Sequence, residues 1–357
     1  MSTRRACRLV AFYLPQYHPI PENNAWWGHG FTEWINVAKA RPLFPGHYQP
    51  HLPADLGFYD LRVPEVRAAQ AALARQYGVE AFCYYHYWFA GKRLLERPFE
   101  EVLRSGEPNF PFCLCWANET WRGKWHGAGN RVLIEQTYPG LEDARNHFKE
   151  LLRAFTDARH LLVDGRPVFV IYAPESLPNA ERTTDLWREL AERAGLKGLY
   201  LVAMCDAESS ARKPGFDAIL MRTLPRALGL YGTHGLGRLL RMARRALRLP
   251  FVVPYSLATR SFRVPEAATR NVHPCVIPNW DNTPRCLRDG LVLLGSTPEL
   301  FRKHLKAAID QVASKPPGER LVFIKSWNEW AEGNYLEPDL QYGKAYLEVV
   351  KTESERT

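Results

Sequence analysis

The sequence predicts a single-domain (β/α)8 barrel of the TIM type with long loops after its strands. Eight short apolar runs alternate with helical patterns along the 357 residues. Strands that are apolar on both faces and joined by helices are typical of a parallel sheet, and eight such units fit a closed barrel of this length. The runner-up is an open doubly wound sheet. It is disfavoured because "LPQYHP", and no glycine-rich phosphate loop, follows the first run.

The expected strands and helices follow one another in regular alternation. β-Branched and aromatic residues dominate each apolar run, which is typical of buried strands. The eight expected strands are residues 8–14, 79–88, 110–117, 167–173, 199–205, 216–222, 273–280 and 321–327. Apolar residues that recur three and four positions apart predict helices between them. The expected helices are residues 63–78, 97–106, 140–157, 183–195 and 297–313.

Turn and capping residues mark where these elements begin and end. Gly78 ends the first helix, the "DGRP" turn precedes the fourth strand, and a Thr-Pro-Glu sequence from Thr297 opens the last helix. No internal repeat, low-complexity tract or linker divides the chain. We therefore assign one barrel to residues 1–357, with residues 226–270 as a basic insertion within it.

Composition narrows the classes of function. The chain is 46% hydrophobic and 24% charged, which is an ordinary globular composition, and its formal net charge is +9. Residues 235–249 alone hold five arginines, and nothing resembles a nucleic-acid-binding module, so nucleic acid is not an expected partner. The seven cysteines are odd in number, lie mostly in apolar runs and lack zinc-site spacing. They indicate reduced thiols, and we expect no metal or cofactor.

The N-terminal segment carries no recognisable targeting signal. Its apolar run before Pro15 is too short for the hydrophobic part of a signal peptide. No window approaches about 18 uninterrupted apolar residues, so no transmembrane helix is expected. These features predict a cytoplasmic protein, either free or peripheral to the inner membrane.

Polar and aromatic side chains gather after seven of the eight expected strands. The active site of a (β/α)8 barrel lies at these strand ends. Indoles stack on the apolar faces of sugars, and amides and carboxylates bind sugar hydroxyls, so the pattern predicts a carbohydrate site. The candidate sugar contacts are Tyr13, His86, Trp116, Asn118, Glu119, Trp280, Asp281, Trp327, Asn328 and Trp330. Any one of these aromatics is more often a core residue, and a lone histidine is more often structural. Their coincidence across seven strand ends favours a site.

Two glutamates in "SWNEWAEGNYLEPD" are the candidate catalytic residues. Glycosidic bond chemistry usually needs two carboxyl groups with different pKa values. Glu329 and Glu332 are three positions apart, so in a continuous strand they would point to opposite faces. They can serve one site only if the strand ends near Glu329 and the chain turns, which Gly333 and Asn334 favour. A solvated acidic turn is the alternative.

Several long motifs carry a resemblance to a known family. "WNEWAEGNYLEPD" resembles the catalytic segment of glycoside hydrolase family 99, the endo-α-mannosidases. The wider chain is similar to the family 99-like WbsX glycosyltransferases of bacterial surface-polysaccharide clusters. That similarity rests on "FYLPQYHPIPENNAWWGHGFTEW", "YYHYWF", "WANETW", "DGRPVFVIY" and "WDNTPR", and it spans nearly the whole chain.

The resemblance implies a (β/α)8 barrel and a role for each glutamate. By analogy, Glu329 is the base on the sugar 2-hydroxyl and Glu332 is the general acid/base at the glycosidic oxygen. The reaction would then retain configuration through a 1,2-anhydro sugar. Glu119 matches a further site carboxylate less closely. Family 99 commonly has histidine where this chain has Ala331, so the mannosidases' substrate preference does not transfer.

Residues 235–249 form a separate basic feature. Arg238, Arg241, Arg244, Arg245 and Arg248 share one face of a predicted amphipathic helix, with leucines on the other. Such helices bind anionic membrane surfaces, and an enzyme acting on a lipid-linked glycan would benefit. The alternative is an outer barrel helix with a solvated face.

The sequence therefore predicts a carbohydrate-active enzyme that cleaves or forms glycosidic bonds with paired glutamates. We expect it to act on an oligosaccharide or lipid-linked glycan in surface-polysaccharide (O-antigen-like) biosynthesis. The alternative is a non-catalytic carbohydrate-binding barrel in the same pathway, which the presence of both glutamates disfavours. Transfer and hydrolysis stay open, because the same carboxyls can deliver a sugar to water or to another hydroxyl.

Overall fold

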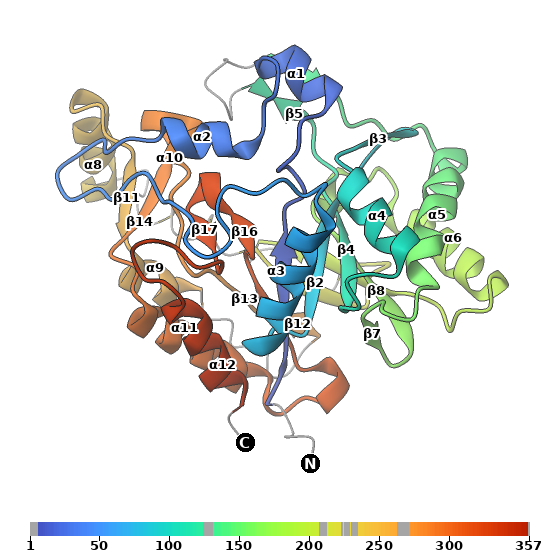
Figure 1. Cartoon of the computed structure of the whole chain (residues 1–357). Coiled ribbons are helices and arrows are strands. Elements are labelled where there is room, and N and C mark those ends of the chain that lie inside the picture. The colour runs from blue at the N-terminus through green and yellow to red at the C-terminus, as the bar shows by residue number, and fades with distance from the viewer. Residues whose placement is uncertain are drawn as a thin grey trace.

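A ring of parallel strands forms the centre of the molecule (Figure 1). The computed structural model describes residues 6–123, 131–206, 213–222, 224, 229, 235–262 and 271–355. The strands of the ring are β1 (Arg8–Tyr13), β2 (Ala81–Phe89), β4 (Phe112–Trp116), β8 (Arg166–Ile171), β9 (Tyr200–Cys205), β10 (Ala218–Met221), β12 (Val272–His273), β13 (Cys275–Val276) and β15 (Leu321–Ile324). They run β12-β10-β9-β8-β4-β2-β1-β15-β13. The predicted TIM-type barrel is confirmed.

The seventh strand of the barrel is interrupted at Pro274. The sequence predicts one strand over 273–280, but the structure has β12 before the proline and β13 after it. β12 pairs with β10, whereas β13 pairs with β15. Pro274 has no backbone N–H to donate, although its carbonyl accepts from the Phe323 amide at 3.0 Å, so the ladder is interrupted there. Counting β12 and β13 as one broken strand gives eight strands in chain order.

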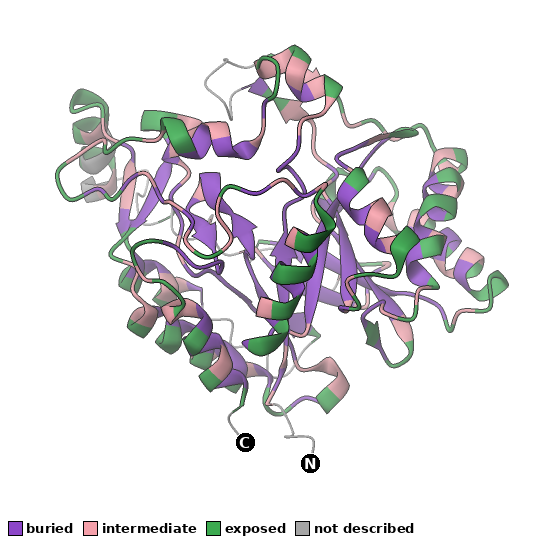
Figure 2. Cartoon of the chain, in the orientation of Figure 1, coloured by how far each residue is buried: buried purple, intermediate pink, exposed green. Residues whose placement is uncertain are grey.

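Helices surround the ring, and most of them are buried on one side and exposed on the other (Figure 2). Six lie where the sequence predicts them: α3 (Pro64–Gln76), α4 (Arg97–Ser105), α5 (Leu141–Phe155), α6 (Ala180–Arg193), α8 (Gly235–Ala246) and α11 (Pro298–Val312). Thr297 caps α11 by accepting from the Leu300 amide at 3.3 Å. α6 begins three residues earlier than expected, because Asn179 caps it by accepting from the Arg182 amide.

Other elements were not evident from periodicity. They are the helices α1 (Pro21–Trp27), α2 (Glu33–Lys39), α9 (Tyr255–Ser261), α10 (Thr283–Cys286) and α12 (Ala345–Ser354), and the short strands β3 (Lys92–Leu94), β5 (Trp121–Arg122), β6 (Val132–Ile134) and β7 (Leu162–Val163). Most lie in the loops, and several are too short for periodicity to be read. Figure 1 shows α1, α2, α10 and β5 together above one end of the barrel.

A small outer layer stands beside the barrel. β11 (Phe251–Pro254) pairs in parallel with β14 (Leu291–Leu294), away from the ring. Tyr255, Ile277 and Trp280 belong to the separate apolar core of this layer. The layer and α8 fall partly within the predicted insertion at 226–270. Residues 225–228, 230–234 and 263–270 lie outside the described residues, so the boundaries of that insertion stay a prediction.

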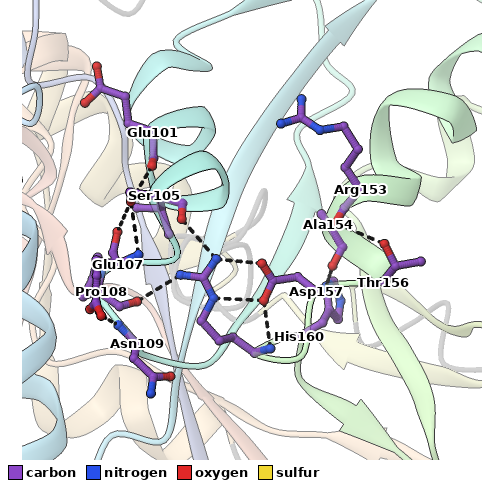
Figure 3. Close-up of polar contacts among 12 residues, drawn as sticks. Glu101, Ser105, Glu107, Pro108, Asn109, Arg153, Ala154, Thr156, Asp157 and His160 are labelled. Atoms are coloured by element: carbon purple, nitrogen blue, oxygen red, sulfur yellow. Dashed lines mark hydrogen bonds and ion pairs between the residues drawn. The ribbon is translucent and has the colours of Figure 1, made fainter.

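Ion pairs fix the opposite end of the barrel, where the strands begin. Arg8 at the start of β1 pairs with Glu80 just before β2, at 2.7 Å. Between α5 and β8, Arg159 donates to both carboxylate oxygens of Asp157, at 2.9 and 2.6 Å, and to the Pro108 carbonyl. Figure 3 labels the two acceptor residues, Asp157 and Pro108. Such bidentate pairs hold loops in place with good geometry. Within the described residues, no helix is long and apolar enough to cross a bilayer.

Candidate active site

A cavity of about 460 Å³ opens at the end of the barrel where the strands finish. Of the predicted site residues, Glu119, Trp280, Glu329 and Glu332 line it. It is also lined by Gln16, Asn23, Trp27, Glu33, Tyr85, Tyr87, Trp121, Arg122, Tyr172, Met204, Arg222, Asn282, Arg285 and Lys325, among others. The helices and strand that supply several of these, α1, α2, α10 and β5, gather at the top of Figure 1.

The cavity wall holds polar atoms that lack partners. Asn23 Nδ2 and Oδ1, Glu33 Oε1 and Trp280 Nε1 are all buried and make no hydrogen bond within the described residues. Buried polar groups in proteins are nearly always hydrogen-bonded to protein, water or ligand. These atoms therefore suit a cavity filled by a polar ligand or by ordered water.

The two glutamates face one cavity because the chain turns between them. β16 (Asn328–Glu329) pairs antiparallel with β17 (Asn334–Tyr335), and a short 3₁₀ helix, Trp330–Glu332, connects them. Gly333 ends that helix in the left-handed region, with φ of 57°. The turn that the sequence required near Glu329 is thus present.

Asp281 holds this turn from outside. Its backbone amide donates to the Glu332 carbonyl at 2.6 Å. A Cβ at Gly333 would lie 3.0 Å from the Cβ and amide of Asp281, so no side chain fits there. The Asp281 carboxylate is itself fixed by His47 at 2.6 Å and by Gln49 at 2.7 Å. The backbone around Glu332 is therefore set by contacts on both sides.

Glu329 is the ionised member of the pair. It is buried, with 4% exposure, and accepts a hydrogen bond from Ser326 Oγ at 2.7 Å. Burial alone would raise its pKa, but the Lys325 ammonium, a hydrogen bond with Glu332 and the Arg285 guanidinium lower the pKa of Glu329 to about 2. A carboxylate held ionised in this way can act as a base.

Glu332 is the protonated member. Burial and the negative charge of Glu329 raise the pKa of Glu332 to about 8. Arg285 opposes this shift, with Nη1 at 2.5 Å from Glu332 Oε1, but it also binds Glu33 at 3.0 Å. One guanidinium shared between two carboxylates neutralises neither fully, so Glu332 keeps its proton near neutral pH. A protonated carboxyl can act as an acid.

Comparison with known proteins decides the family. The family model described as glycosyltransferase WbsX matches residues 9–350. The chain belongs to the WbsX glycosyltransferase family. Relatives named as uncharacterised protein WxcX, from two strains of Xanthomonas campestris pv. campestris, are 41% identical over 354 residues, which is 96% of this chain and 49% of theirs. The chain thus spans about half the length of the curated relatives it matches.

Solved structures support the fold of this WbsX-family chain. A glycoside hydrolase-like protein matches with a TM-score of 0.63 and 14% identity, over 100% of this chain and 96% of the other. The family 99 endo-α-mannosidase from Bacteroides thetaiotaomicron matches at 0.55 and 14% identity, over 97% and 95% of the two chains. At this identity the likeness concerns the fold. Family and fold together indicate a carbohydrate-active enzyme.

Four predicted sugar contacts of the WbsX-family chain lie behind the turn that carries Glu329 and Glu332 and do not line the cavity. Trp330 stacks on Tyr335 at 3.8 Å and donates from Nε1 to Glu337 at 2.7 Å. The Asn328 amide pairs with both backbone polar groups of Leu14. The other two are Trp327, fully buried in the core, and Tyr13, whose hydroxyl donates to Gln70 Oε1. These side chains support the turn.

The remaining four also lie off the cavity. His86 and His147 share a hydrogen bond at 2.9 Å between their Nε2 atoms. Trp116 packs edge-on against His147. Asn118 pairs with the amide and carbonyl of Ala173, and Asp281 anchors the turn as described above. In each case the polar group is used by a neighbour in the protein, so the geometry gives these residues supporting positions.

Sequence reasoning missed several lining residues. In β2, Tyr85 and Tyr87 face the cavity whereas His86 between them faces outward. Successive side chains of a strand point to opposite faces, so the sequence shows that Tyr85 and Tyr87 share one face and His86 lies on the other. It does not show which of the two faces points into the barrel. Lys325 could have been predicted as a site residue, because a lysine in the apolar run "LVFIKSW" is buried only when it pairs with a charged group. Nothing in the sequence placed Arg285 beside Glu332.

Proposed function

We propose that this chain cleaves or forms glycosidic bonds, with Glu329 and Glu332 as its proton-transferring pair, during assembly of a bacterial surface polysaccharide of the O-antigen type. The observation that carries the proposal is that two buried carboxyls line one cavity in different surroundings, which lower the pKa of Glu329 and raise that of Glu332. Paired carboxyls with separated pKa values are what glycosidic bond chemistry requires. The biosynthetic setting rests on the family.

Each glutamate has a defined step in this mechanism. Glu329 removes the proton from the sugar 2-hydroxyl, and the freed oxygen attacks the anomeric carbon. The bond to the leaving oxygen breaks as Glu332 donates its proton to that oxygen. The 1,2-anhydro sugar that results is opened at the anomeric carbon by water or an acceptor hydroxyl, whose proton passes to Glu332. Glu329 then returns a proton to the 2-oxygen, so the configuration is retained.

The other lining residues position the sugar. Tyr85, Tyr87 and Trp280 bring aromatic rings to the cavity, and such rings stack on the apolar faces of pyranoses. Lys325 lies 5.5 Å from the Tyr172 ring centroid and 5.4 Å from that of Trp280. The ammonium that lowers the pKa of Glu329 is therefore held against two aromatic rings that line the cavity. Glu119 adds a third carboxyl, whose pKa is raised by burial.

Glu332→Gln is the direct test. Loss of a general acid typically costs about 10²–10⁴-fold in rate, so turnover of the substrate glycan should fall by that factor. Products are followed by mass spectrometry after incubation with candidate oligosaccharides, with and without activated donors. Free sugar released without a donor indicates hydrolysis, and a lengthened glycan indicates transfer.

Glu80→Gln serves as the matched control. Glu80 pairs with Arg8 at the far end of the barrel, so this carboxyl-to-amide change leaves the cavity intact. Unchanged turnover in Glu332→Gln would exclude catalysis by this pair and favour a carbohydrate-binding barrel. The wild-type rate should also fall as the pH rises through about 8, where Glu332 loses its proton.

The proposal extends to a peripheral contact of α8 with the cytoplasmic face of an anionic membrane. Leu239 and Met242 are 61% and 58% exposed, and Arg238 and Arg245 are also exposed. Arg244 instead packs over Phe251, 3.8 Å from its ring centroid, and Phe251 lines the cavity. α8 therefore adjoins the cavity wall, where a lipid-linked glycan would enter.

Vesicle flotation tests this contact. The protein should float with phosphatidylglycerol vesicles and not with phosphatidylcholine vesicles. Replacing Arg238 and Arg245 with Gln should weaken binding about thirtyfold, because each basic residue near an anionic surface contributes about 1 kcal/mol. The matched control replaces Arg153 and Arg193, exposed arginines of other helices. Equal loss in both double variants would argue against a specific role for α8.

A further inference from the structure

A second cavity, of about 170 Å³, is separated from the first by one wall of the first cavity. Residues 279–282 and β14 form the partition between the two cavities. Trp280 and Asn282 line the first cavity, whereas Asn279 and Asp281 line the second. Consecutive side chains alternate because this segment runs antiparallel beside β14, with Leu293 N donating to Trp280 O at 2.8 Å.

The charged groups of the second cavity are already occupied by protein contacts. Asp281 accepts from His47, Gln49 and Thr283, and Asp339 accepts from Tyr335 Oη and from two backbone amides. No lysine or arginine is among the described residues that line it. An anion would meet two carboxylates without a cation, and a cation would have to displace existing hydrogen bonds. The cavity therefore favours a neutral ligand.

The amide side chains and aromatic rings that line the second cavity narrow the class of ligand. Asn279 and Gln341, whose side chains end in amides, line the cavity and are at least partly exposed. Tyr48, which is 40% exposed, and Tyr342 bring rings to the same space. Amides beside exposed tyrosine rings are the groups that bind a sugar ring, through its hydroxyls and its apolar face.

The walls are held rigidly before any ligand arrives. His51 Nδ1 lies 2.7 Å from Tyr335 Oη, which donates to Asp339 Oδ2 at 2.7 Å. Ser296 Oγ and Tyr346 Oη form another hydrogen bond, at 2.8 Å. The volume is smaller than the range of about 300–1,000 Å³ that is typical of drug-sized ligands, so it suits one ring and not an oligosaccharide.

We propose that this second cavity is a saccharide-binding site for a single neutral sugar unit, separate from the reacting centre. The identity of the ligand as a sugar rests on the proposed function. Asp281 connects the two cavities, because its carboxylate borders the second cavity and its amide donates to the Glu332 carbonyl. A sugar bound here thus contacts the segment that sets the backbone of the catalytic turn.

Ligand-observed NMR with simple glycosides tests the site in the full chain. The probes are methyl α-D-mannopyranoside, methyl α-D-glucopyranoside and methyl α-L-rhamnopyranoside, titrated against Glu332→Gln, in which we expect turnover to be slowed. At least one probe should give saturation-transfer signals. Tyr48→Ala and Gln341→Ala should each weaken its binding about three- to tenfold, the size of one lost contact.

Leu340→Ala is the matched control, because Leu340 is 66% exposed next to Gln341 and is not among the described lining residues. It should leave probe binding unchanged. The proposal is overturned if no probe binds, if binding ignores Tyr48 and Gln341, or if glucuronate binds more tightly than the neutral glycosides. Failure of the catalytic proposal would appear separately, as undiminished turnover by Glu332→Gln.

Discussion

At the starts of the barrel strands, Glu80 and Asp157 each pair with one arginine and are partly exposed to solvent. Arg8 pairs with Glu80, and Arg159 donates two hydrogen bonds to Asp157, which is labelled in Figure 3. At the strand ends, Glu33 and Glu332 share Arg285, and all three side chains are largely buried. The same chemical groups thus stabilise one end and are left incompletely neutralised at the other.

Burial and the ratio of arginines to carboxylates explain this difference. The hydrogen bonds from Arg159 lower the pKa of Asp157, which is the usual outcome for a paired acid. Burial and the charge of Glu329 raise the pKa of Glu332, and the arginine that it shares with Glu33 does not offset them. Incomplete neutralisation costs stability, and it leaves a carboxyl that can donate a proton near neutral pH.

Among changes that test this difference between the two ends, removing Arg285 should lower the free energy of unfolding the most. Arg285→Met leaves Glu33 buried without its cation, and breaking a buried pair in this way typically costs about 3–5 kcal/mol. Urea denaturation measures the change in the free energy of unfolding. Arg153→Met is the control on the outer helices, where a pair with Glu100 that is 58% exposed on the arginine side should contribute about 0–1 kcal/mol. Equal losses would mean that the buried, shared arginine is no more important for stability than an exposed one.

A smaller effect should follow from a methyl group at the turn between Glu329 and Asn334. Gly333→Ala places a non-glycine residue at φ of 57° and drives its Cβ to 3.0 Å from Asp281. The left-handed conformation alone costs about 1–2 kcal/mol. Gly343→Ala is a matched control, because φ is 52° there and nothing lies within 4 Å of its Cβ.

The difference between the two glycine variants isolates the contact with Asp281. We expect Gly333→Ala to unfold at a lower urea concentration than Gly343→Ala and to lose turnover, whereas Gly343→Ala keeps it. Indistinguishable variants would show that Asp281 does not hold the turn.

The two ends should also respond to pH in opposite directions. Glu332 has a raised folded pKa, so its stabilisation is present below its unfolded pKa of about 4.5 and is lost as pH rises through about 8. Asp157 has a lowered folded pKa, so its stabilisation is present above its unfolded pKa and is lost as pH falls.

Urea midpoints across the pH range separate the two contributions. Glu332→Gln should flatten the loss of stability toward alkaline pH, and Asp157→Asn should flatten the loss toward acid pH. Asp157 is partly exposed, so its contribution is discounted for solvent screening and should be the smaller one. A Glu332→Gln variant that still loses stability toward alkaline pH as the wild type does would contradict the assignment of its pKa.

The barrel and the glutamate pair could be predicted from the sequence because both depend on local patterns. Apolar runs and periodic helices are properties of neighbouring residues, and the turn at Gly333 is encoded within a few positions. The direction of each side chain is a different matter. His86 and Tyr85 are adjacent in β2, and only the closure of the ring determines which of them faces the cavity. Arg285 reaches Glu332 through loop geometry that no spacing reveals.

The strand interrupted at Pro274, which consists of β12 and β13, is a weakly paired part of the barrel wall, and we call it the seam. β12 and β13 each share two paired residues with their neighbours, whereas β1 and β2 share four. Fewer ladder contacts mean that local opening costs least there. Backbone amides beside this seam should exchange with deuterium sooner than those of β1 and β2. Because the seam leads directly into Trp280 and Asp281, thermal motion that parts β10 from β15 would reach both cavities at once.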